Sequence, residues 1–463
     1  MKIQSVGIIG AGIGGLTTGA LLTKKGFKVK IFEKEPYIGG RALSFDGSNM
    51  KLDEYKKLLS RFNMNVAFSE PDLKTIFEKN LIAGYRLDLG YHAIGGGVLS
   101  NVNSVLSELG DNVDFLESYV GLIKEEGYDF PFLSRIDKLK ILPNIFRLLF
   151  ASENRLKQLD KISMSETIKQ YGKGKMKLIL EVFSRSITTI NNLDKISSGE
   201  MLRAQRNLYK GSKPVGYPIE GLGSITDKFA SYIKKNGGEI YLNKTVRKIN
   251  IKNNKASSIE VDGKNHSFDI IISNILIQNL FKILDKKYFP SQYEKQIKSL
   301  PGTASLCGYY SLNNLDRNLI GKTFHFIERN VGLEGNDVVG MIDFMAANPK
   351  ANLSPIKKYL VQSYVICNPN EAKDKKTLKK LKEMLDKNLR IILPNFKTNL
   401  NWAIYPAIWH LDGVAKTINN EKPSIKTPIE NLFLVGDCVK APGIGFNCAL
   451  NSARILADTI NSK

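Results

Sequence analysis

The chain has 463 residues, more than one ordinary domain holds, and suits two or three domains with separate cores. Hydrophobic residues make up 43% and charged residues 24%, which excludes a disordered or fibrous protein. Lysine and arginine outnumber acidic residues 67 to 45, for a net charge of +22. This excess either favours an anionic partner, such as lipid head groups, or reflects lysine enrichment spread along the whole chain.

The cysteines and the lengths of the apolar runs indicate in which compartment the protein works and whether it can span a membrane. The four cysteines form no CxxC pair and no cluster with histidine, so we expect a reducing compartment and no metal site. Residues 1–22 have the composition of a signal peptide but match a strand, a glycine turn and a helix better, so we expect a cytoplasmic protein. No uncharged apolar run reaches the roughly 18 to 20 residues that span a bilayer, so any membrane contact should be peripheral. No nucleic-acid-binding signature occurs, and we expect no such partner.

The N-terminal segment has the pattern of a dinucleotide-binding βαβ unit. The spacing predicts a strand over 6–9, a helix over 16–25 and a second strand over 28–32. The turn between the first strand and the helix contains Gly10, Gly12, Ile13, Gly14 and Gly15. Such a turn lets a pyrophosphate approach the helix N-terminus. Glu33 ends the second strand, where a carboxylate can accept hydrogen bonds from ribose hydroxyls, so we predict a bound dinucleotide.

The rest of the chain alternates between helical and strand-like segments. In the first half we expect a helix over 52–62, strand-like chain over 86–97, a helical region over 135–201 and a Pro/Gly-rich return over 211–223. A helix ending at 235, two strands within 239–261 and a buried strand over 269–273 should follow. The last part should contain a sheet over 301–415 with a lysine-rich helix at 378–393, and then a strand, a glycine loop and a helix over 431–460. No internal repeat or low-complexity linker is present.

Two further motifs indicate which dinucleotide binds. Gly39-Gly40-Arg41 follows Glu33, and Gly436-Asp437 follows the apolar stretch LFLV. With these motifs the sequence resembles the superfamily of FAD-dependent amine oxidases and phytoene desaturases. The likeness also covers the stretches 217–223, 237–246 and 268–273. It implies non-covalent FAD and an α/β fold, in which a discontinuous Rossmann-type, glutathione reductase-like domain carries an inserted α+β substrate domain and a helical cap.

The resemblance also implies domain boundaries and site residues. Segments 1–88, 212–292 and 425–463 would form the FAD-binding domain, 89–134 and 293–424 the substrate-binding mixed sheet, and 135–211 the cap. The implied FAD contacts are Gly10, Gly12, Ile13, Gly14, Gly15, Glu33, Lys34, Gly40, Arg41, Val246, Gly436, Asp437, Gly445, Phe446 and Asn447. Arg41 would approach the pyrophosphate, Val246 the adenine, and Asp437 a ribityl hydroxyl or a pyrophosphate-linked water. The loop 443–447 would aim the next helix N-terminus at the flavin pyrimidine edge, where reduced flavin gathers negative charge.

Within the superfamily, the stretch APGIG at 441–445 is most similar to phytoene desaturases, carotenoid isomerases and retinol saturases. It implies a long isoprenoid or carotenoid-like lipid and hydride transfer to or from flavin N5. Two departures stand out: the segment 43–87 separates GGR from DLGYH, and Lys440-Ala441 stands where desaturases usually show Thr-His. The alternatives are a FAD-dependent amine oxidase and a flavin-free prenyl-protein escort of the Rab GDP-dissociation-inhibitor type, against which the intact FAD motifs argue. No second GxGxxG occurs, so the electron partner is open between a quinone, oxygen, a carrier protein and the substrate itself.

Several residues are candidates for the substrate side. His92, in DLGYH, could be a catalytic acid or base, or could hydrogen-bond the flavin. Tyr405, Trp409 and His410 could line a substrate cavity or pack in the core, and Cys438 could link flavin covalently or be a buried thiol. The stretch LKILPNIFRLLF at 139–150 has basic residues at its margins, and it is either a core helix of the cap or an interfacial helix. We expect a peripheral membrane contact through 135–155.

Overall fold

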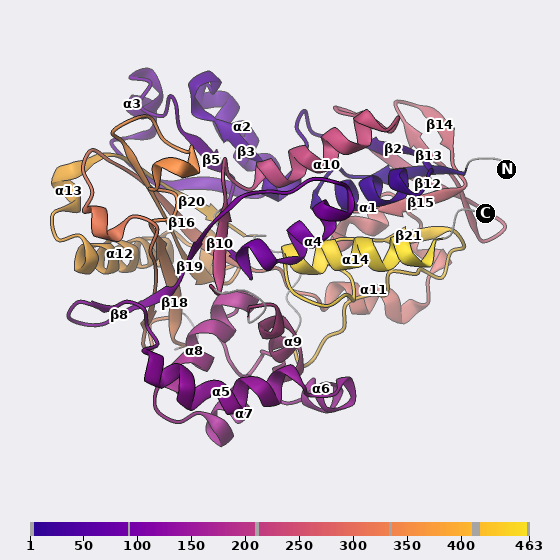
Figure 1. Cartoon of the computed structure of the whole chain (residues 1–463). Helices are drawn as coiled ribbons and strands as arrows, with labels where there is room; N and C mark the ends of the chain where they lie inside the picture. Colours follow the sequence, from indigo (N-terminus) through magenta and orange to yellow (C-terminus); the bar gives the residue numbers. More distant parts are fainter. Residues whose placement is uncertain (1–3, 91–92, 209–212, 333–335, 410–416, 461–463) are drawn as a thin grey trace.

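A computed structural model of the chain describes residues 4–90, 93–208, 213–332, 336–409 and 417–460. Figure 1 shows two large sheets beside each other, with a group of helices below them. The part around the first sheet combines indigo, rose and yellow segments, so it is built from the N-terminal, middle and C-terminal thirds of the chain.

The first sheet is parallel throughout and has five strands. In order across the sheet they are β11 (Glu239–Tyr241), β2 (Lys28–Phe32), β1 (Ser5–Ile9), β15 (Ile270–Ser273) and β21 (Leu432–Leu434). The central strands are almost wholly apolar and buried, as expected when both faces of a parallel sheet are covered. Helix α1 (Ile13–Lys24) packs against α10 (Gly223–Lys235) and α14 (Phe446–Thr459). The predicted discontinuous Rossmann-type domain is thus confirmed.

Smaller elements complete this part of the molecule. An antiparallel sheet contains β12 (Val246–Lys252), β13 (Lys255–Val261) and β14 (Lys264–Ser267), and the accompanying helices are α4 (Asn101–Glu108) and α11 (Ser291–Lys298). Connecting sheets pair β3 (Ser44–Asp46) with β5 (Arg86–Asp88), and β10 (Val215–Pro218) with both β6 (Ile94–Gly95) and β7 (Phe115–Ser118). These connecting strands lead the chain between the two large sheets.

The second sheet has eight strands and lies in the other half of the molecule. In order they are β4 (Met64–Glu70), β20 (Leu400–Ile408), β16 (Ala304–Leu312), β19 (Tyr359–Cys367), β18 (Val338–Asp343), β17 (Thr323–Glu328), β8 (Val120–Ile123) and β9 (Tyr128–Asp129). Only the β17–β8 pair is parallel among these. Every residue of β16 is buried, so both sheet faces are covered, with α12 (Lys375–Ile392) against it. Strand β4 comes from the segment 43–87, and its pairing with β20 joins that segment to this sheet.

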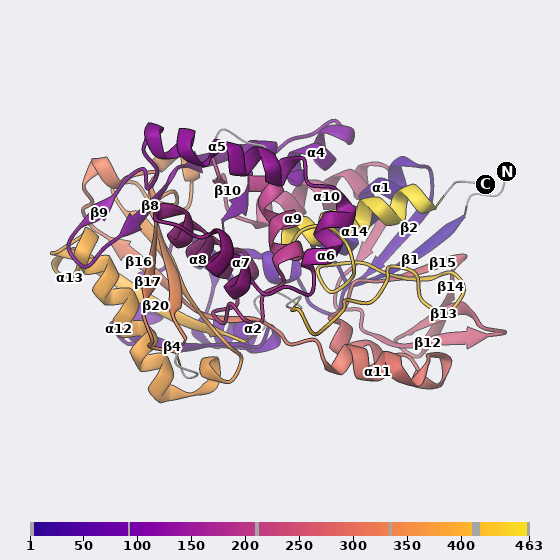
Figure 2. The same cartoon turned by 90° about the horizontal axis from the view of Figure 1, so that it is seen from below.

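Three short helices flank this sheet, and five helices form the cap. The short helices are α2 (Leu52–Arg61), α3 (Leu73–Glu78) and α13 (Phe396–Asn399). The cap contains α5 (Arg135–Leu149), α6 (Glu153–Leu159), α7 (Met164–Tyr171), α8 (Lys175–Thr188) and α9 (Ser198–Leu208), which Figure 2 shows from below. Across the described ranges, no helix combines the length and the apolar character that crossing a bilayer requires.

Candidate functional site

The glycine turn after β1 leaves the N-terminus of α1 open to a ligand. Gly12 occupies the N-cap position, no side chain caps the helix, and no acidic residue lies in its first turn. A Cβ atom at Gly15 would lie 2.1 Å from the carbonyl oxygen of Gly10, so only glycine fits there. The backbone N–H groups at this helix end, with the positive end of the helix dipole, can therefore bind a phosphate.

Glu33 is held in a fixed orientation at the end of β2. Its Oε2 accepts the backbone N–H of Ala11 at 2.7 Å, and its Oε1 accepts the N–H of Glu35 at 2.9 Å. Burial raises the pKa of this carboxyl group, and the two N–H bonds oppose that shift. Each carboxylate oxygen can still accept another hydrogen bond, which suits a ribose hydroxyl.

Arg41 and Asp437 meet although 396 positions separate them in the sequence. Arg41 Nη2 donates to Asp437 Oδ1 at 3.0 Å and to Oδ2 at 3.1 Å. Gly436, just before the aspartate, has a φ of +118°, a conformation that favours glycine. This ion pair ties the GGR motif to the loop after β21, next to the glycine turn.

Asn274 is a site residue that the sequence analysis missed. It directly follows β15, and its Oδ1 lies 2.6 Å from the position that a Cβ at Gly14 would occupy and 2.9 Å from that of Gly436. Its side chain therefore fills the space between the two glycine loops. The available signal was its position, because the residue after a buried parallel strand lies at the carboxyl edge of the sheet, where ligands bind.

These groups surround a cavity of about 410 Å³, which we call the cofactor cleft. Of the predicted FAD contacts, Gly10, Gly12, Ile13, Glu33, Lys34, Gly40, Arg41, Val246, Gly436, Asp437, Gly445 and Phe446 line the cleft. Gly14 and Gly15 lie behind its wall, in α1, and Asn447 lines a neighbouring cavity instead. The cleft is also lined by Arg61, Lys244 and Lys282, which the sequence analysis did not name as FAD contacts. An open helix end, five cationic side chains and a buried carboxylate at the end of β2 fit the anionic and ribose parts of FAD.

A second open helix N-terminus lies at the start of α14. Gly445 is its N-cap residue, no side chain caps it, and its first turn has no acidic residue. Asn447 Oδ1 is buried and has no hydrogen-bond partner among the described residues. A 14-residue helix with a free N-terminus favours negative charge beside it.

The neighbouring cavity, about 120 Å³, is called the inner chamber here. Its lining comprises Ala93, Ile94, Gly95, Phe183, Ser186, Ile187, Thr189, Ala204, Val215, His325, Met341, Tyr364 and the loop 443–447, with no charged side chain among these described residues. His325, on β17, is 2% exposed, and its Nδ1 has no hydrogen-bond partner within the described part of the chain. Burial lowers its pKa to about 4, so the imidazole is neutral at physiological pH. The sequence analysis did not single out His325.

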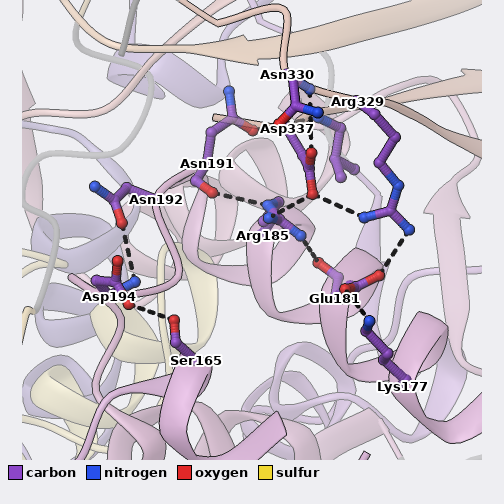
Figure 3. A network of polar contacts seen from close by, with 11 residues as sticks. Ser165, Lys177, Glu181, Arg185, Asn191, Asn192, Asp194, Arg329, Asn330 and Asp337 are labelled. Atoms are coloured by element: carbon purple, nitrogen blue, oxygen red, sulfur yellow. Dashed lines mark hydrogen bonds and ion pairs between the residues drawn. The ribbon is translucent and has the colours of Figure 1, made fainter. Parts of the chain in front are cut away.

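A polar network around the buried Arg185, shown in Figure 3, fixes α8. This helix contributes Phe183, Ser186 and Ile187 to the lining of the inner chamber. Arg185 donates from Nη2 to Asp337 Oδ2 at 3.2 Å, from Nε to the carbonyl of Asn191 at 2.7 Å, and from Nη1 to the carbonyl of Glu181 at 3.0 Å. Arg329 bridges the Glu181 and Asp337 carboxylates at 2.8 and 2.7 Å. The helix is therefore anchored to the loop between β17 and β18.

The remaining candidates have different outcomes. His92 and His410 lie outside the described residues. Tyr405 is fully buried and donates to Asp386 Oδ1 on α12 at 2.6 Å, and Trp409 contacts Lys373, so both pack in the core around the second sheet and line none of these cavities. Cys438 lines the cofactor cleft, and burial raises the pKa of its thiol well above its ordinary value, which keeps it protonated.

Comparisons with known proteins agree with this geometry. The family of flavin-containing amine oxidoreductases matches residues 13–461. An uncharacterized protein of Methanocaldococcus jannaschii is 27% identical and covers 78% of this chain and 86% of its own length. A 1-hydroxycarotenoid 3,4-desaturase from a Flavobacterium species is 24% identical over 66% of this chain and 63% of its own length.

Two solved structures share the fold. An oxidoreductase from Methanosarcina mazei is 21% identical with a TM-score of 0.70, covering 98% of this chain and 100% of that one. A putrescine oxidase bound to putrescine is 13% identical with a TM-score of 0.66, covering 99% of each chain. The resemblance drawn from the sequence motifs is confirmed, and the chain belongs to the flavin-containing amine oxidoreductase family, with FAD as its cofactor.

Proposed function

We propose that this flavoenzyme oxidises, reduces or isomerises a long isoprenoid- or carotenoid-like lipid. The observation that carries the proposal is a second, larger cavity of about 750 Å³ within the cap, which has a mostly apolar lining and shares Phe183 with the inner chamber. A long apolar chain could occupy the cap cavity and extend past Phe183 into the inner chamber.

Bound FAD supplies the redox chemistry, because N5 of its ring exchanges a hydride with a substrate carbon. The chain contributes binding and orientation. Glu33, Arg41 and the N-terminus of α1 would hold the ribose and phosphates, and the free N-terminus of α14 favours negative charge next to it. The described lining of the inner chamber would place no charged side chain beside the reacting carbon, and neutral His325 would offer one hydrogen-bonding nitrogen.

The charges of the lining residues disfavour an amine substrate. A buried ammonium group is stabilised by a carboxylate or by aromatic rings, and the inner chamber offers only the second of these, through Phe183 and Tyr364. Neither the inner chamber nor the cap cavity has an Asp or Glu side chain in its described lining, and the cap cavity has cationic side chains instead. The escort alternative is disfavoured because a flavin-free protein has no need of the intact cofactor cleft.

The proposal includes a membrane surface as the source of the lipid. On α5, the apolar side chains Ile136, Leu139 and Phe146 are 65%, 68% and 49% exposed, and Phe150 just beyond its end is 81% exposed. Exposed Lys138, Lys140 and Arg147 accompany them, as expected for a helix that contacts anionic lipid.

An anaerobic absorbance titration of the purified holoenzyme tests the function. A polyisoprenoid in liposomes should bleach the oxidised flavin, or reoxidise the dithionite-reduced flavin if the enzyme saturates its substrate. Polyamines such as putrescine should do neither. Bleaching by the amine alone would replace the lipid proposal with an amine oxidase.

A further inference from the structure

The cap cavity is built by the whole cap and by the second sheet. All five cap helices contribute lining residues, and the chain around β8 and β9 supplies Tyr119, Val120, Pro131, Phe132 and Leu133. Its volume of about 750 Å³ lies within the usual range for small-molecule sites, about 300–1,000 Å³. It is larger than the cofactor cleft and the inner chamber, and nothing in the FAD-binding machinery requires it.

The lining of the cap cavity has cations but no acidic side chain among the described residues. Lys138, Arg147 and Arg155 line it, and all three are exposed. Lys138 Nζ lies 4.4 Å from the centre of the Tyr119 ring, and Arg155 donates to Gln158 Oε1 at 3.2 Å. Within the described ranges, none of the three forms an ion pair with a carboxylate.

Other arginines in and beside the cap behave differently. Arg185 pairs with Asp337, Arg203 with Asp160, Arg206 with Glu153, and Arg329 with both Glu181 and Asp337. These four arginines have carboxylate partners, whereas the three cations at the rim of the cavity, like exposed Arg135 on α5, have none among the described residues. An uncompensated cationic rim around an apolar cavity matches a ligand with a negative head and an apolar body.

One face of α8 connects this cavity with the inner chamber. Met176, Ile179, Leu180 and Phe183 line the cap cavity, and Phe183, Ser186 and Ile187 line the inner chamber. The spacing of three and four residues puts these side chains on one side of the helix. A molecule that lies along this face would have one end at the cationic rim and the other beside the N-terminus of α14.

We propose that the cap cavity binds the redox substrate as an anionic amphiphile, a single long apolar chain with a phosphate or carboxylate head at Lys138, Arg147 and Arg155. This inference rests on the proposed lipid function and narrows its substrate class, because a neutral hydrocarbon would give the cations that line the cavity no partner inside it. The head stays at the rim while the chain passes Phe183 and presents a carbon to the inner chamber.

Calorimetric binding to the FAD-loaded protein tests the site without turnover. The probes are geranylgeranyl monophosphate below its micelle concentration and uncharged geranylgeraniol. The double variant Arg147→Gln, Arg155→Gln should weaken binding of the phosphate about tenfold or more and leave the alcohol unchanged. The control variant Arg135→Gln, Lys140→Gln removes the same charge from exposed positions of the same region that do not line the cavity. Ile179→Trp, which fills the apolar part, should weaken binding of both probes.

Three results would overturn the inference. If the unsubstituted protein bound the phosphate and the alcohol with equal affinity, the rim would not be a head-group site. If the control variant lost as much affinity for the phosphate, the effect would come from long-range electrostatic attraction and not from contacts at the rim. If the rim variant lost binding to phosphatidylglycerol vesicles but kept binding of the monomeric phosphate, the rim would serve bilayer head groups and not the substrate. Failure of the proposed lipid function would give a different result. The protein would then bind the phosphate tightly, and lose this binding in the rim variant, but its flavin absorbance would not change.

Discussion

Replacing the buried Arg185 with methionine should loosen α8 from the second sheet. The side chain of Arg185 is 5% exposed and makes three hydrogen bonds, two of which join the helix to Asn191 and Asp337. Methionine has a similar length but cannot donate, so the carbonyl of Asn191 would lose this donor. The helix carries Phe183, which lines both the cap cavity and the inner chamber, so its anchoring also matters for the proposed substrate path.

The expected loss of stability depends on which ion pair Asp337 keeps after the substitution. Removing one partner of a buried ion pair costs about 3–5 kcal/mol when the other charge is left unpaired. Asp337 would keep Arg329, whose Nη1 lies 2.7 Å from its Oδ2, so we expect the lower end, about 3 kcal/mol. With about 1.4 kcal/mol for each factor of ten, local opening of α8 should become about a hundredfold more frequent.

Hydrogen exchange of peptides covering α8, followed by mass spectrometry, measures this opening directly. The matched control is Arg329→Gln, whose side chain is 47% exposed and should cost no more than about 1 kcal/mol. An increase in exchange for the control as large as for Arg185→Met would refute the reasoning. The exposed bridge, and not the buried guanidinium, would then hold the helix.

Three further predictions concern the cofactor cleft and the inner chamber. Gly15→Ala should yield protein with little bound flavin, seen in the ratio of flavin to protein absorbance, because the new methyl group would collide with the carbonyl of Gly10. Arg41→Met should raise the dissociation constant for FAD about tenfold or more, because it removes a cation and leaves the Asp437 carboxylate facing the phosphates. Flavin fluorescence measures this constant, and Arg41→Lys should restore part of the affinity. His325 has a pKa of about 4, below that of the unfolded chain, so it stabilises the fold above about pH 6.5 and this contribution is lost as the pH falls towards 4. His325→Phe should flatten the acid side of the stability profile by up to about 3 kcal/mol, and an unchanged profile would show that other groups cause the acid loss.

The sequence predicts those parts of the site that depend on local geometry. The glycine turn, Glu33 and the motif after β21 each lie within a short strand, turn or helix, and the periodicity of those segments gives their positions at the sheet edge. The parallel sheet follows from the same pattern, because strands buried on both faces are continuously apolar. The assignment of these motifs to FAD required their combination, since one glycine turn alone fits several dinucleotides.

Contacts between distant segments could not be predicted. Arg41 and Asp437 were both singled out, but nothing local shows that they pair across 396 positions. His325 lies on β17, where the four residues Thr323–Phe326 are all buried, so the sequence of this strand does not show which cavity each of its sides faces. For the same reason Tyr405, an expected candidate for the cavity, points to α12 instead.

The charges of the three cavities give the two proposals a common physical basis. The cofactor cleft and the cap cavity have cationic side chains, whereas the inner chamber between α8 and α14 has none in its described lining. Two anionic molecules, FAD and the amphiphile, would therefore each be held by charges far from the reacting atoms. Binding energy from remote contacts could then orient the substrate carbon, while the chamber keeps competing charge away from it. A reacting centre between two charged anchors needs no charged side chain of its own, which fits a small, uncharged chamber in a chain with a net charge of +22.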